Sequence, residues 1–408
     1  MPEDWKNSIL ILVYKGKGDP LECGSYRGIK LLEHAMKVVE RVLEKRIREQ
    51  AVIDNMQFGF MPGKGTTDAI FIVRQVQEKY RSKGKCLYMA FVDLEKAFDR
   101  IPREVLRWAM RQLKVDEWLV SAVMVMYDGV TTVVRTPFGD SDSFPVRVGV
   151  HQGSILSPLL FAMVMEAITK NTRAGLPYEL LYADDLVLLA ESMDELISKI
   201  QKWKEVLERK GMKVNVAKTK VMISGALKAE EVRSKCPCGV CGKGVGNNSV
   251  TCTKCKKWVH KRCSGVKGSL VKVSGTFACR KCNEPAGNIN AAVEKVDIGN
   301  GVTLETVKQF CYLGDTIDAA GGSDQAITAR IRSGWYKFRC MACVLLAKDI
   351  SLALRGKVYG ACVRSCMLYG GETWPMKKED ELRIERNDRR MIRWMVGAKL
   401  SDRVSDSA

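Results

Sequence analysis

The sequence predicts an α+β fold that carries a small cysteine-rich insert. Three observations favour this class. Strand-like apolar runs are interleaved with amphipathic helical segments in an irregular order, unlike the regular repeat of a doubly wound sheet. Eight of the 15 cysteines fall between Cys236 and Cys282. From about Gln325 onward the chain is mainly helical in pattern and rich in Arg and Lys.

Length and charge limit the possible functions. A chain of 408 residues suggests two or three domains, and its hydrophobic content of 46% is enough for real cores. The formal net charge of +19 favours a polyanionic partner such as nucleic acid. No apolar run reaches the roughly twenty residues that span a bilayer, and the N-terminus lacks the order of a signal peptide. We therefore expect an intracellular protein of the nucleus and cytoplasm, with no membrane partner.

The first part of the chain predicts a strand and two helices. The strand is the apolar run ILILVY, residues 9–14. In the segment HAMKVVERVLEKRI, apolar residues recur at helical spacing, at Met36, Val39, Leu43 and Ile47. A second helix is expected after GKGTTD, where Thr66 or Thr67 can cap it.

The next part predicts strands at whose ends chemistry could lie. The segment CLYMAFVDLEKAFD begins as a continuous apolar strand with Asp93 at its end, where α/β folds usually place functional residues. Further strands are expected over residues 131–135 and 145–150. A helix should follow, because Ser157 and Pro158 suit a first helical turn.

Two adjacent carboxylates, Asp184 and Asp185, lie in LLYADDLVLLA, which predicts two strands joined by a tight turn. A helix from Ser192 to Lys210, closed by Gly211, should follow. Like charges in a half-buried setting repel each other and lose hydration, so a cation or strong donors usually offset the cost. A solvated turn is the alternative. Together with the carboxylate at residue 93, the pair could converge on two Mg²⁺ ions and serve phosphoryl transfer.

Several segments, in order, resemble the sequence blocks of reverse transcriptases from non-LTR (LINE-like) retrotransposons. They are KGKGDPLECGSYRGIKLL, QFGFMPGKGTTDAI, FVDLEKAFD, GVHQGSILSPLLF, YADD, GMKVNVAKTKVMI, FCYLGDTI and LYGGETW. The resemblance implies a right-hand polymerase, with fingers and palm over residues 1–235, the end of the palm over 284–324 and a helical thumb over 325–408. It also implies RNA-directed DNA synthesis, with an RNA template, a DNA primer or target, and dNTPs as partners.

The resemblance assigns catalytic roles to four residues. Asp93, Asp184 and Asp185 match the polymerase carboxylate triad that holds two Mg²⁺ ions, with Asp93 and Asp184 as the more direct ligands. Lys218 matches the lysine proposed to protonate the departing pyrophosphate, a plausible general acid. As one of 66 basic residues, it could also be an ordinary surface lysine.

Four more residues match positions that contact the nucleotide in this family. Phe98 matches the aromatic that crowds a ribose 2′-hydroxyl, and Arg27 matches a basic residue over the triphosphate. Gln152 and Gly153 match a pair beside the incoming nucleotide, where glycine permits close backbone approach. The alternatives are that Phe98 only packs its helix, that Gln152 is an ordinary loop amide and that Arg27 is a surface residue.

The cysteine-rich insert, residues 236–283, has the spacing of metal ligands. From Cys238 it runs C-x2-C, ten residues, C-x2-C, four residues, H-x2-C, fifteen residues and C-x2-C. In a reducing compartment such cysteines indicate metal binding, and eight ligands in four pairs suit two tetrahedral structural zinc sites. The segment has little core, so zinc should supply much of its folding free energy.

The insert resembles a PHD-type zinc finger, including Trp258 two residues before His260. The cross-braced pairing of that family implies two ligand sets: Cys238, Cys241, His260 and Cys263 for one zinc ion, and Cys252, Cys255, Cys279 and Cys282 for the other. Cys236 could compete with Cys238 as the first ligand.

The partner of the insert is less defined than its fold. Its only aromatic residues are Trp258 and Phe277, and it has ten Lys and Arg but no Asp or Glu. This composition argues against reading methyl-lysine in chromatin and favours phosphate contacts with nucleic acid. A zinc knuckle with no partner is the alternative.

We therefore expect an RNA-directed DNA polymerase with two catalytic Mg²⁺ and two structural Zn²⁺ ions. The alternative is a catalytically inactive element fragment that acts as a zinc-dependent nucleic-acid or chromatin binder. The chain begins close to the first polymerase block and has no endonuclease or RNase H segment, so we expect it to be part of a longer element protein.

Overall fold

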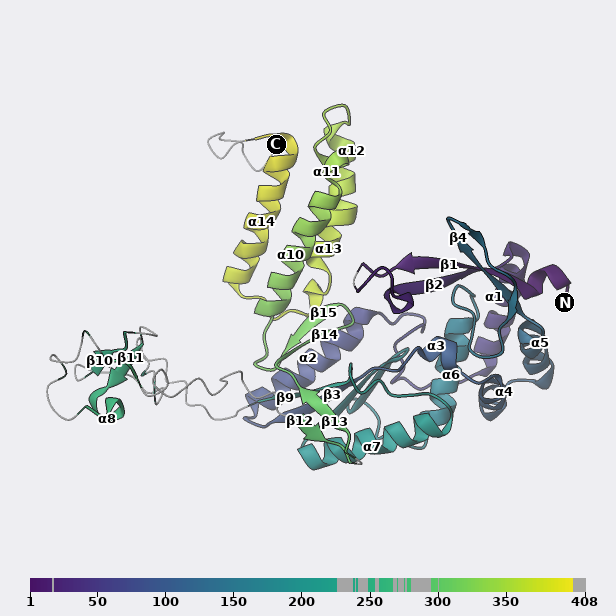
Figure 1. Ribbon diagram of the computed structural model, residues 1–408, viewed down its shortest axis with the longest axis horizontal. Helices are drawn as coiled ribbons and strands as arrows, with labels where there is room; N and C mark the ends of the chain where they lie inside the picture. The colour runs from purple at the N-terminus through teal and green to yellow at the C-terminus, as the bar shows by residue number, and fades with distance from the viewer. Residues whose placement is uncertain are drawn as a thin grey trace. The chain divides into compact units, whose positions relative to one another are not determined.

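The computed structural model describes residues 1–16, 18–225, 295–299 and 301–398, and within the insert residues 238, 240, 249–253, 257–266, 270, 275 and 277–279. The chain forms two compact units. The larger comprises Met1–Gly225 and Lys295–Ala408, and the smaller comprises Ala226–Glu294. Figure 1 shows both units.

The larger unit is built on a six-stranded sheet with the strand order β12-β13-β9-β3-β8-β7. Its strands are β3 (Leu87–Val92), β7 (Glu179–Tyr182), β8 (Asp185–Ala190), β9 (Lys220–Ser224), β12 (Lys295–Asp297) and β13 (Thr303–Thr306). All neighbours are antiparallel except β9 and β13, which are parallel. The mixture of strands and helices confirms the predicted α+β class.

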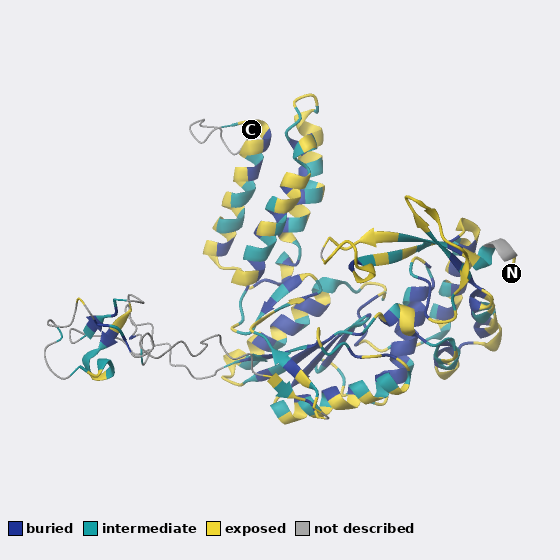
Figure 2. Cartoon of the chain, in the orientation of Figure 1, coloured by how far each residue is buried: buried dark blue, intermediate teal, exposed yellow. Residues whose placement is uncertain are grey.

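The two faces of this sheet belong to two hydrophobic cores. Ala90 and Val92 of β3 lie in one core, and Met89 and Phe91 lie in the other, because successive side chains of a strand point to opposite faces. The first core draws mainly on five helices: α1 (His34–Gln50), α4 (Arg103–Gln112), α5 (Glu117–Tyr127), α6 (Ser157–Thr169) and α7 (Met193–Arg209). The second draws on α2 (Thr66–Ser82). Burial on both faces explains the unbroken apolar sequence of β3. The central strands of this sheet are largely dark blue in Figure 2, whereas β12 and β13 are not.

A second sheet near the N-terminus has the order β2-β1-β4-β5, with β6 also paired to β4. Its strands are β1 (Asn7–Tyr14), β2 (Tyr26–Leu31), β4 (Thr131–Thr136), β5 (Gly139–Asp140) and β6 (Phe144–Pro145). The strand predicted over residues 145–150 is wrong beyond Pro145. The N–H groups of Gly149 and Val150 bond instead to the carbonyls of Ile101 and Phe98, which follow β3, so this segment becomes a loop tied to that region.

The part of the chain after residue 308 forms a hairpin and then helices. The hairpin joins β14 (Gln309–Tyr312) to β15 (Asp315–Asp318). The helices are α10 (Asp324–Cys340), α11 (Ala342–Leu345), α12 (Leu352–Val358), α13 (Ser365–Leu368) and α14 (Lys378–Val396). They share a third core, in which the long helices α10 and α14 are neighbours (Figure 1). Across the described residues, no helix is both long and apolar enough to traverse a bilayer.

A buried ion pair joins the hairpin to α2. Arg74 of α2 lies 2.9 Å from the Oδ2 of Asp315, and both side chains are almost completely buried. Trp374, which follows the short helical turn η5 (Gly371–Thr373), donates its indole N–H to the same oxygen at 3.1 Å. Helix α2, the β14–β15 hairpin and the segment at Trp374 therefore meet at one carboxylate.

The ends of the helices agree with the sequence in most places. The Ser192 hydroxyl caps α7, Gly211 follows that helix in the left-handed conformation, and Pro158 lies in the first turn of α6. The expected Thr66 or Thr67 cap of α2 is wrong. Gly65 precedes the helix, and the Asp68 carboxylate accepts its N–H at 2.6 Å. A carboxylate in the first turn can reach back to the N–H of the residue before the helix, and its charge is favourable at this end of the helix dipole.

The described part of the smaller unit contains a two-stranded sheet of β10 (Ser249–Thr251) and β11 (Trp258–His260), followed by α8 (Lys261–Ser264). Its small core includes Val250, Val259 and Phe277 together with buried cysteines. The remaining short elements lie in the larger unit and are η1 (Glu3–Lys6), η2 (Cys23–Ser25), α3 (Ala97–Arg100) and η4 (Tyr359–Arg364).

Candidate active site

The three predicted aspartates meet at one edge of the central sheet. Asp93 directly follows Val92, which pairs with Leu186 in the antiparallel β3–β8 ladder. Asp185 directly precedes Leu186, so the two carboxylates leave neighbouring strands at the same level. Asp184 lies in the turn between β7 and β8, which confirms the predicted hairpin.

Burial and mutual repulsion raise the pKa values of the two turn carboxylates. For Asp184 the cause is mainly burial, with the charge of Asp93 adding to it. For Asp185, burial followed by the charges of Asp184 and Asp93 raises the pKa to about 6. A site that holds several partly desolvated carboxylates together favours either protonation or a bound cation.

Two predicted basic residues face these carboxylates. Lys218 Nζ lies 3.4 Å from Asp93 Oδ2 as an ion pair that lacks hydrogen-bond geometry, and the lysine is 70% exposed. Its charge also lowers the pKa values of Asp184 and Asp185. The charge of Arg27 on β2 lowers the pKa of Asp184. The structure thus brings together five of the eight predicted polymerase residues.

The other three predicted residues form a neighbouring group around the loop before α6. Phe98 stacks on Phe161 at 4.4 Å between ring centroids and contacts Phe60 edge to face. The Gln152 side chain donates to Asp99 at 2.9 Å, and its carbonyl accepts the N–H of Lys30. Packing and hydrogen bonding therefore hold these side chains.

Gly153 lies where no side chain fits. Its φ is +110°, and a Cβ atom there would stand 2.5 Å from the Lys30 carbonyl oxygen. The loop can approach β2 this closely only with glycine at residue 153.

A cavity of about 340 Å³ opens beside the carboxylates. Its lining includes the charged residues Asp93, Asp185 and Lys218 together with Phe310, Cys311 and Tyr312 of β14. The site is therefore open next to its charged groups and has a partly aromatic wall.

Tyr312 is a site residue that the sequence did not reveal. It is 2% exposed, and its hydroxyl has no hydrogen-bond partner among the residues described. Burial raises its pKa above the usual range, and the charge of Asp185 adds to this effect. The block FCYLGDTI contained it, but nothing in that pattern distinguished a tyrosine at the site from a core tyrosine.

Comparison with known proteins identifies the family. The family model described as "Reverse transcriptase (RNA-dependent DNA polymerase)" matches residues 14–316, well over half of the chain. This chain belongs to the reverse transcriptase family.

Known relatives of this reverse transcriptase come from mobile elements. The Pol polyprotein of retrotransposable element R2 from Nasonia vitripennis is 28% identical over 61% of this chain and 25% of its own length. The probable RNA-directed DNA polymerase of transposon X-element from Drosophila melanogaster is 33% identical over 40% of this chain and 18% of its own length. The probable RNA-directed DNA polymerase of transposon BS from the same species is 24% identical over 91% of this chain and 36% of its own length. The chain thus spans about a fifth to a third of these relatives.

Among solved structures, a telomerase from Candida tropicalis aligns with this chain at 16% sequence identity and a TM-score of 0.41. The alignment covers 58% of this chain and 43% of the telomerase chain.

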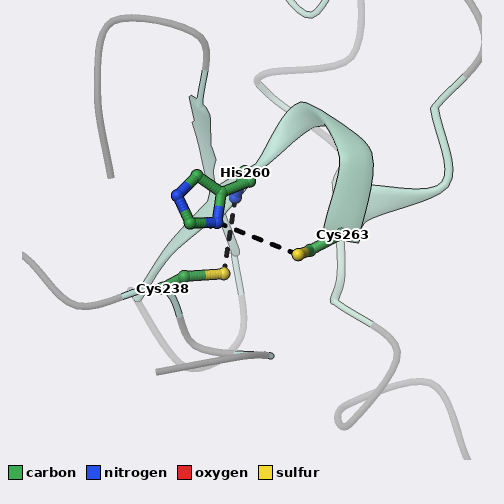
Figure 3. A group of neighbouring side chains, drawn as sticks. All are labelled: Cys238, His260 and Cys263. Atoms are coloured by element: carbon green, nitrogen blue, oxygen red, sulfur yellow. Dashed lines mark hydrogen bonds between the residues drawn. The ribbon is translucent and has the colours of Figure 1, made fainter. Parts of the chain in front are cut away.

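The smaller unit of this reverse transcriptase holds a cluster of three side chains that could bind a metal ion. Cys238, His260 and Cys263 bring their ligand atoms within 4.8 Å of one another, as Figure 3 shows. The Nδ1 atom of His260 lies 3.8 Å from the Cys263 sulfur, and its backbone N–H donates to the Cys238 sulfur. Sulfur and imidazole nitrogen are typical zinc ligands. In the part of the chain that the structure describes, this is the one group of three such side chains whose ligand atoms all lie this close together. The carboxylate oxygens of Asp93, Asp184 and Asp185 are therefore more widely spaced than the ligand atoms of this group.

A second pair of predicted zinc ligands is also close together. The backbone N–H of Cys279 donates to the sulfur of Cys252 at 3.3 Å, and both residues are buried. The predicted ligands Cys241, Cys255 and Cys282, and the competing Cys236, lie outside the described residues.

Proposed function

We propose that this chain is an RNA-directed DNA polymerase of a non-LTR retrotransposon. It extends the 3′-hydroxyl of a primer with dNTPs on an RNA template. The observation that carries the proposal is the juxtaposition of Asp93, at the end of β3, with the Asp184–Asp185 turn, within a chain of this family. The net charge of +19 suits a polyanionic template and primer.

The aspartates fit Mg²⁺ because they offer only oxygen donors. In this proposal Asp93 and Asp184 are the direct ligands of two ions, and Asp185 completes the set. The buried Asp93 Oδ2 accepts no hydrogen bond among the described residues, which leaves it available to a cation. Bound there, two such ions would lower the pKa of the attacking hydroxyl and stabilise the departing oxygen.

The basic residues would act on the phosphates of the nucleotide. Arg27, whose charge lowers the pKa of Asp184, would bind the triphosphate through its fork of N–H donors. Lys218, beside Asp93 and largely exposed, would give its proton to the departing pyrophosphate.

The group before α6 would shape the nucleotide site. Phe98, held by Phe161, would exclude a ribose 2′-hydroxyl and so favour dNTPs. Gln152 and Gly153 would line the place of the incoming nucleotide. The absence of a side chain at Gly153 and the hydrogen bond from the Lys30 N–H to the Gln152 carbonyl keep this loop close to β2.

We further propose that the smaller unit binds two zinc ions as a PHD-like finger. One would be held by Cys238, Cys241, His260 and Cys263, and the other by Cys252, Cys255, Cys279 and Cys282. The clustering of three ligands of the first set and the contact between Cys252 and Cys279 support this pairing.

Nucleic acid is the favoured partner of this finger, with chromatin as the alternative. Phe277 is buried in the core of the unit, which leaves Trp258 as its exposed aromatic residue within the described part. A cage for methyl-lysine needs several such residues. With ten basic and no acidic residues in the finger, binding should weaken steeply as salt rises.

Primer extension tests the polymerase. The purified chain is given a DNA primer on an RNA template, Mg²⁺ and dNTPs. Extension of the primer, and no extension when ribonucleotides replace the dNTPs, is expected. Binding of the primer and template without any extension would instead support an inactive, zinc-dependent nucleic-acid binder.

A further inference from the structure

A loop between α1 and α2 lies directly against the turn that carries the two adjacent aspartates. Residues 56–58 run beside β7: Leu181 donates its N–H to the Met56 carbonyl at 2.9 Å, and its own carbonyl accepts the N–H of Phe58 at 2.7 Å. Gln57 forms a parallel bridge with Leu181. The loop thus follows the edge strand toward the turn.

The side chain of Gln57 reaches the turn itself. It is 1% exposed, and its Oε1 accepts two backbone N–H groups, from Gly59 at 2.9 Å and from Ala183 at 3.0 Å. Both partners are donors, so only the oxygen of the amide can face them. A buried acceptor with two donors fixes the side chain and the turn together.

Ala183 is the residue that needs this support. It lies immediately before Asp184, is 4% exposed and has a φ of +57°. A side chain disfavours this left-handed conformation, so it persists only where the surroundings impose it. The hydrogen bond from the Ala183 N–H to Gln57 Oε1 is one such constraint, because a buried donor without a partner is costly.

Gly59 allows the loop to come this close. A Cβ atom at Gly59 would stand 2.3 Å from the Ala183 nitrogen and 2.9 Å from the Tyr182 carbonyl carbon. Only glycine fits against the backbone of the turn at this distance. The short segment QFGF therefore supplies both an acceptor and the space to use it.

We propose that Gln57 is a positioning residue that holds the left-handed turn at Ala183 and thereby aims Asp184 and Asp185. It does not contact substrate. The inference builds on the proposed polymerase function, in which these carboxylates bind divalent cations. Loss of the Oε1 acceptor should let the turn relax and spread the two carboxylates over several orientations.

The test replaces the acceptor without changing the size of the side chain. Gln57→Met should lower kcat for single-nucleotide extension by tenfold or more, with the KM for the dNTP changed less than threefold. It should also weaken Mn²⁺ binding, measured by electron paramagnetic resonance on the enzyme without nucleotide, by about the same factor.

A matched control is Gln77→Met. Gln77 is 3% exposed and donates to Ser224 Oγ and the Asp318 carbonyl, away from the turn, so this variant loses comparable buried hydrogen bonds. Its Mn²⁺ affinity should equal that of the wild type. A second variant, Ala183→Gly, relieves the strain at residue 183 and should restore part of the activity and Mn²⁺ affinity of Gln57→Met.

The outcomes separate two failures. If the wild type extends primers and binds Mn²⁺ but Gln57→Met behaves as Gln77→Met does in both measurements, the inference is overturned. If the wild type does not extend primers, the polymerase proposal fails, and Mn²⁺ binding alone decides on Gln57: weakened binding supports its positioning role and unchanged binding overturns it.

Discussion

At the scale of single residues, the carboxylates of the site oppose folding when no cation is bound. Burial and the charges of Asp184 and Asp93 raise the pKa of Asp185 from 3.8 to about 6. Between about pH 4 and pH 6 the Asp185 carboxyl therefore stays protonated in the folded chain, whereas it is ionised in the unfolded chain. Stability contributed by this group is present below that window and is lost as pH rises through it.

This sign predicts the behaviour of Asp185→Asn. In metal-free buffer at pH 7.5 the variant should be more stable than the wild type, on the order of 1–3 kcal/mol, since one pKa unit corresponds to about 1.4 kcal/mol. Below about pH 4 the difference should vanish, because both chains are then neutral at residue 185. Thermal unfolding at both pH values measures it. A variant that is less stable at pH 7.5 would contradict the assigned burial of this carboxylate.

The sequence revealed the three acidic residues to which we assign the chemistry. Asp93, Asp184 and Asp185 follow from strand ends and a turn, which are local patterns. The role of Gln57 could not be predicted from the sequence, although its segment QFGF was recognised, because its hydrogen-bond partner Ala183 is far away in the chain. The contact of a side chain with a distant backbone leaves no periodicity.

At the scale of elements, several helices and strands were predictable, and two of the errors share a cause. Helix α1 buries Met36, Leu43 and Ile47 as expected, but Val39 is exposed and Glu40 is buried instead, where its carboxylate accepts the Ile155 N–H at 2.9 Å. The failed strand over residues 145–150 also gives its N–H groups to a distant segment. Tertiary hydrogen bonds override local patterns in both places.

The Arg74–Asp315 pair makes a prediction about the joint between α2 and the β14–β15 hairpin. Arg74→Met leaves the Asp315 carboxylate buried without its cation and should cost about 3–5 kcal/mol of unfolding free energy. Urea unfolding measures this loss. The matched control is Arg135→Met. Arg135 forms an exposed ion pair with Asp140, so its loss should change the free energy of unfolding very little.

A double variant sharpens this prediction. If the loss comes from an uncompensated charge, Arg74→Met combined with Asp315→Asn should be more stable than Arg74→Met alone. An equal or larger loss in the double variant would mean that packing, and not the charge, accounts for the effect.

At the scale of the whole molecule, the chain consists of a polymerase-type unit interrupted by a second compact unit, Ala226–Glu294. The cysteine spacing predicted the presence of an insert. It could not give the side-chain arrangement, which depends on how β10, β11 and α8 fold around the sulfur atoms. The fingers, palm and thumb boundaries remain predictions from the family resemblance.

Zinc content and its removal test the insert. Metal analysis should find about two zinc ions per chain, and Cys263→Ser should lose about one, whereas the exposed Cys343→Ser should retain both. A strong chelator should remove hydrogen-exchange protection from β10 and β11 but leave β3 and β8 protected, because zinc supplies folding free energy only to the smaller unit. Absence of zinc, or unchanged protection after chelation, would remove the finger hypothesis.

The central claim is that Asp93, Asp184 and Asp185 form one catalytic site. Primer extension by the Asp→Asn variant of each, beside the exposed control Asp142→Asn, tests it most directly. A metal ligand stabilises the transition state by several kcal/mol, so Asp93→Asn and Asp184→Asn should each lower the extension rate on the order of a hundredfold or more. Asp185→Asn should also lower the extension rate substantially. Asp142→Asn should retain the wild-type rate. Extension by Asp93→Asn or Asp184→Asn at the wild-type rate would contradict the claim.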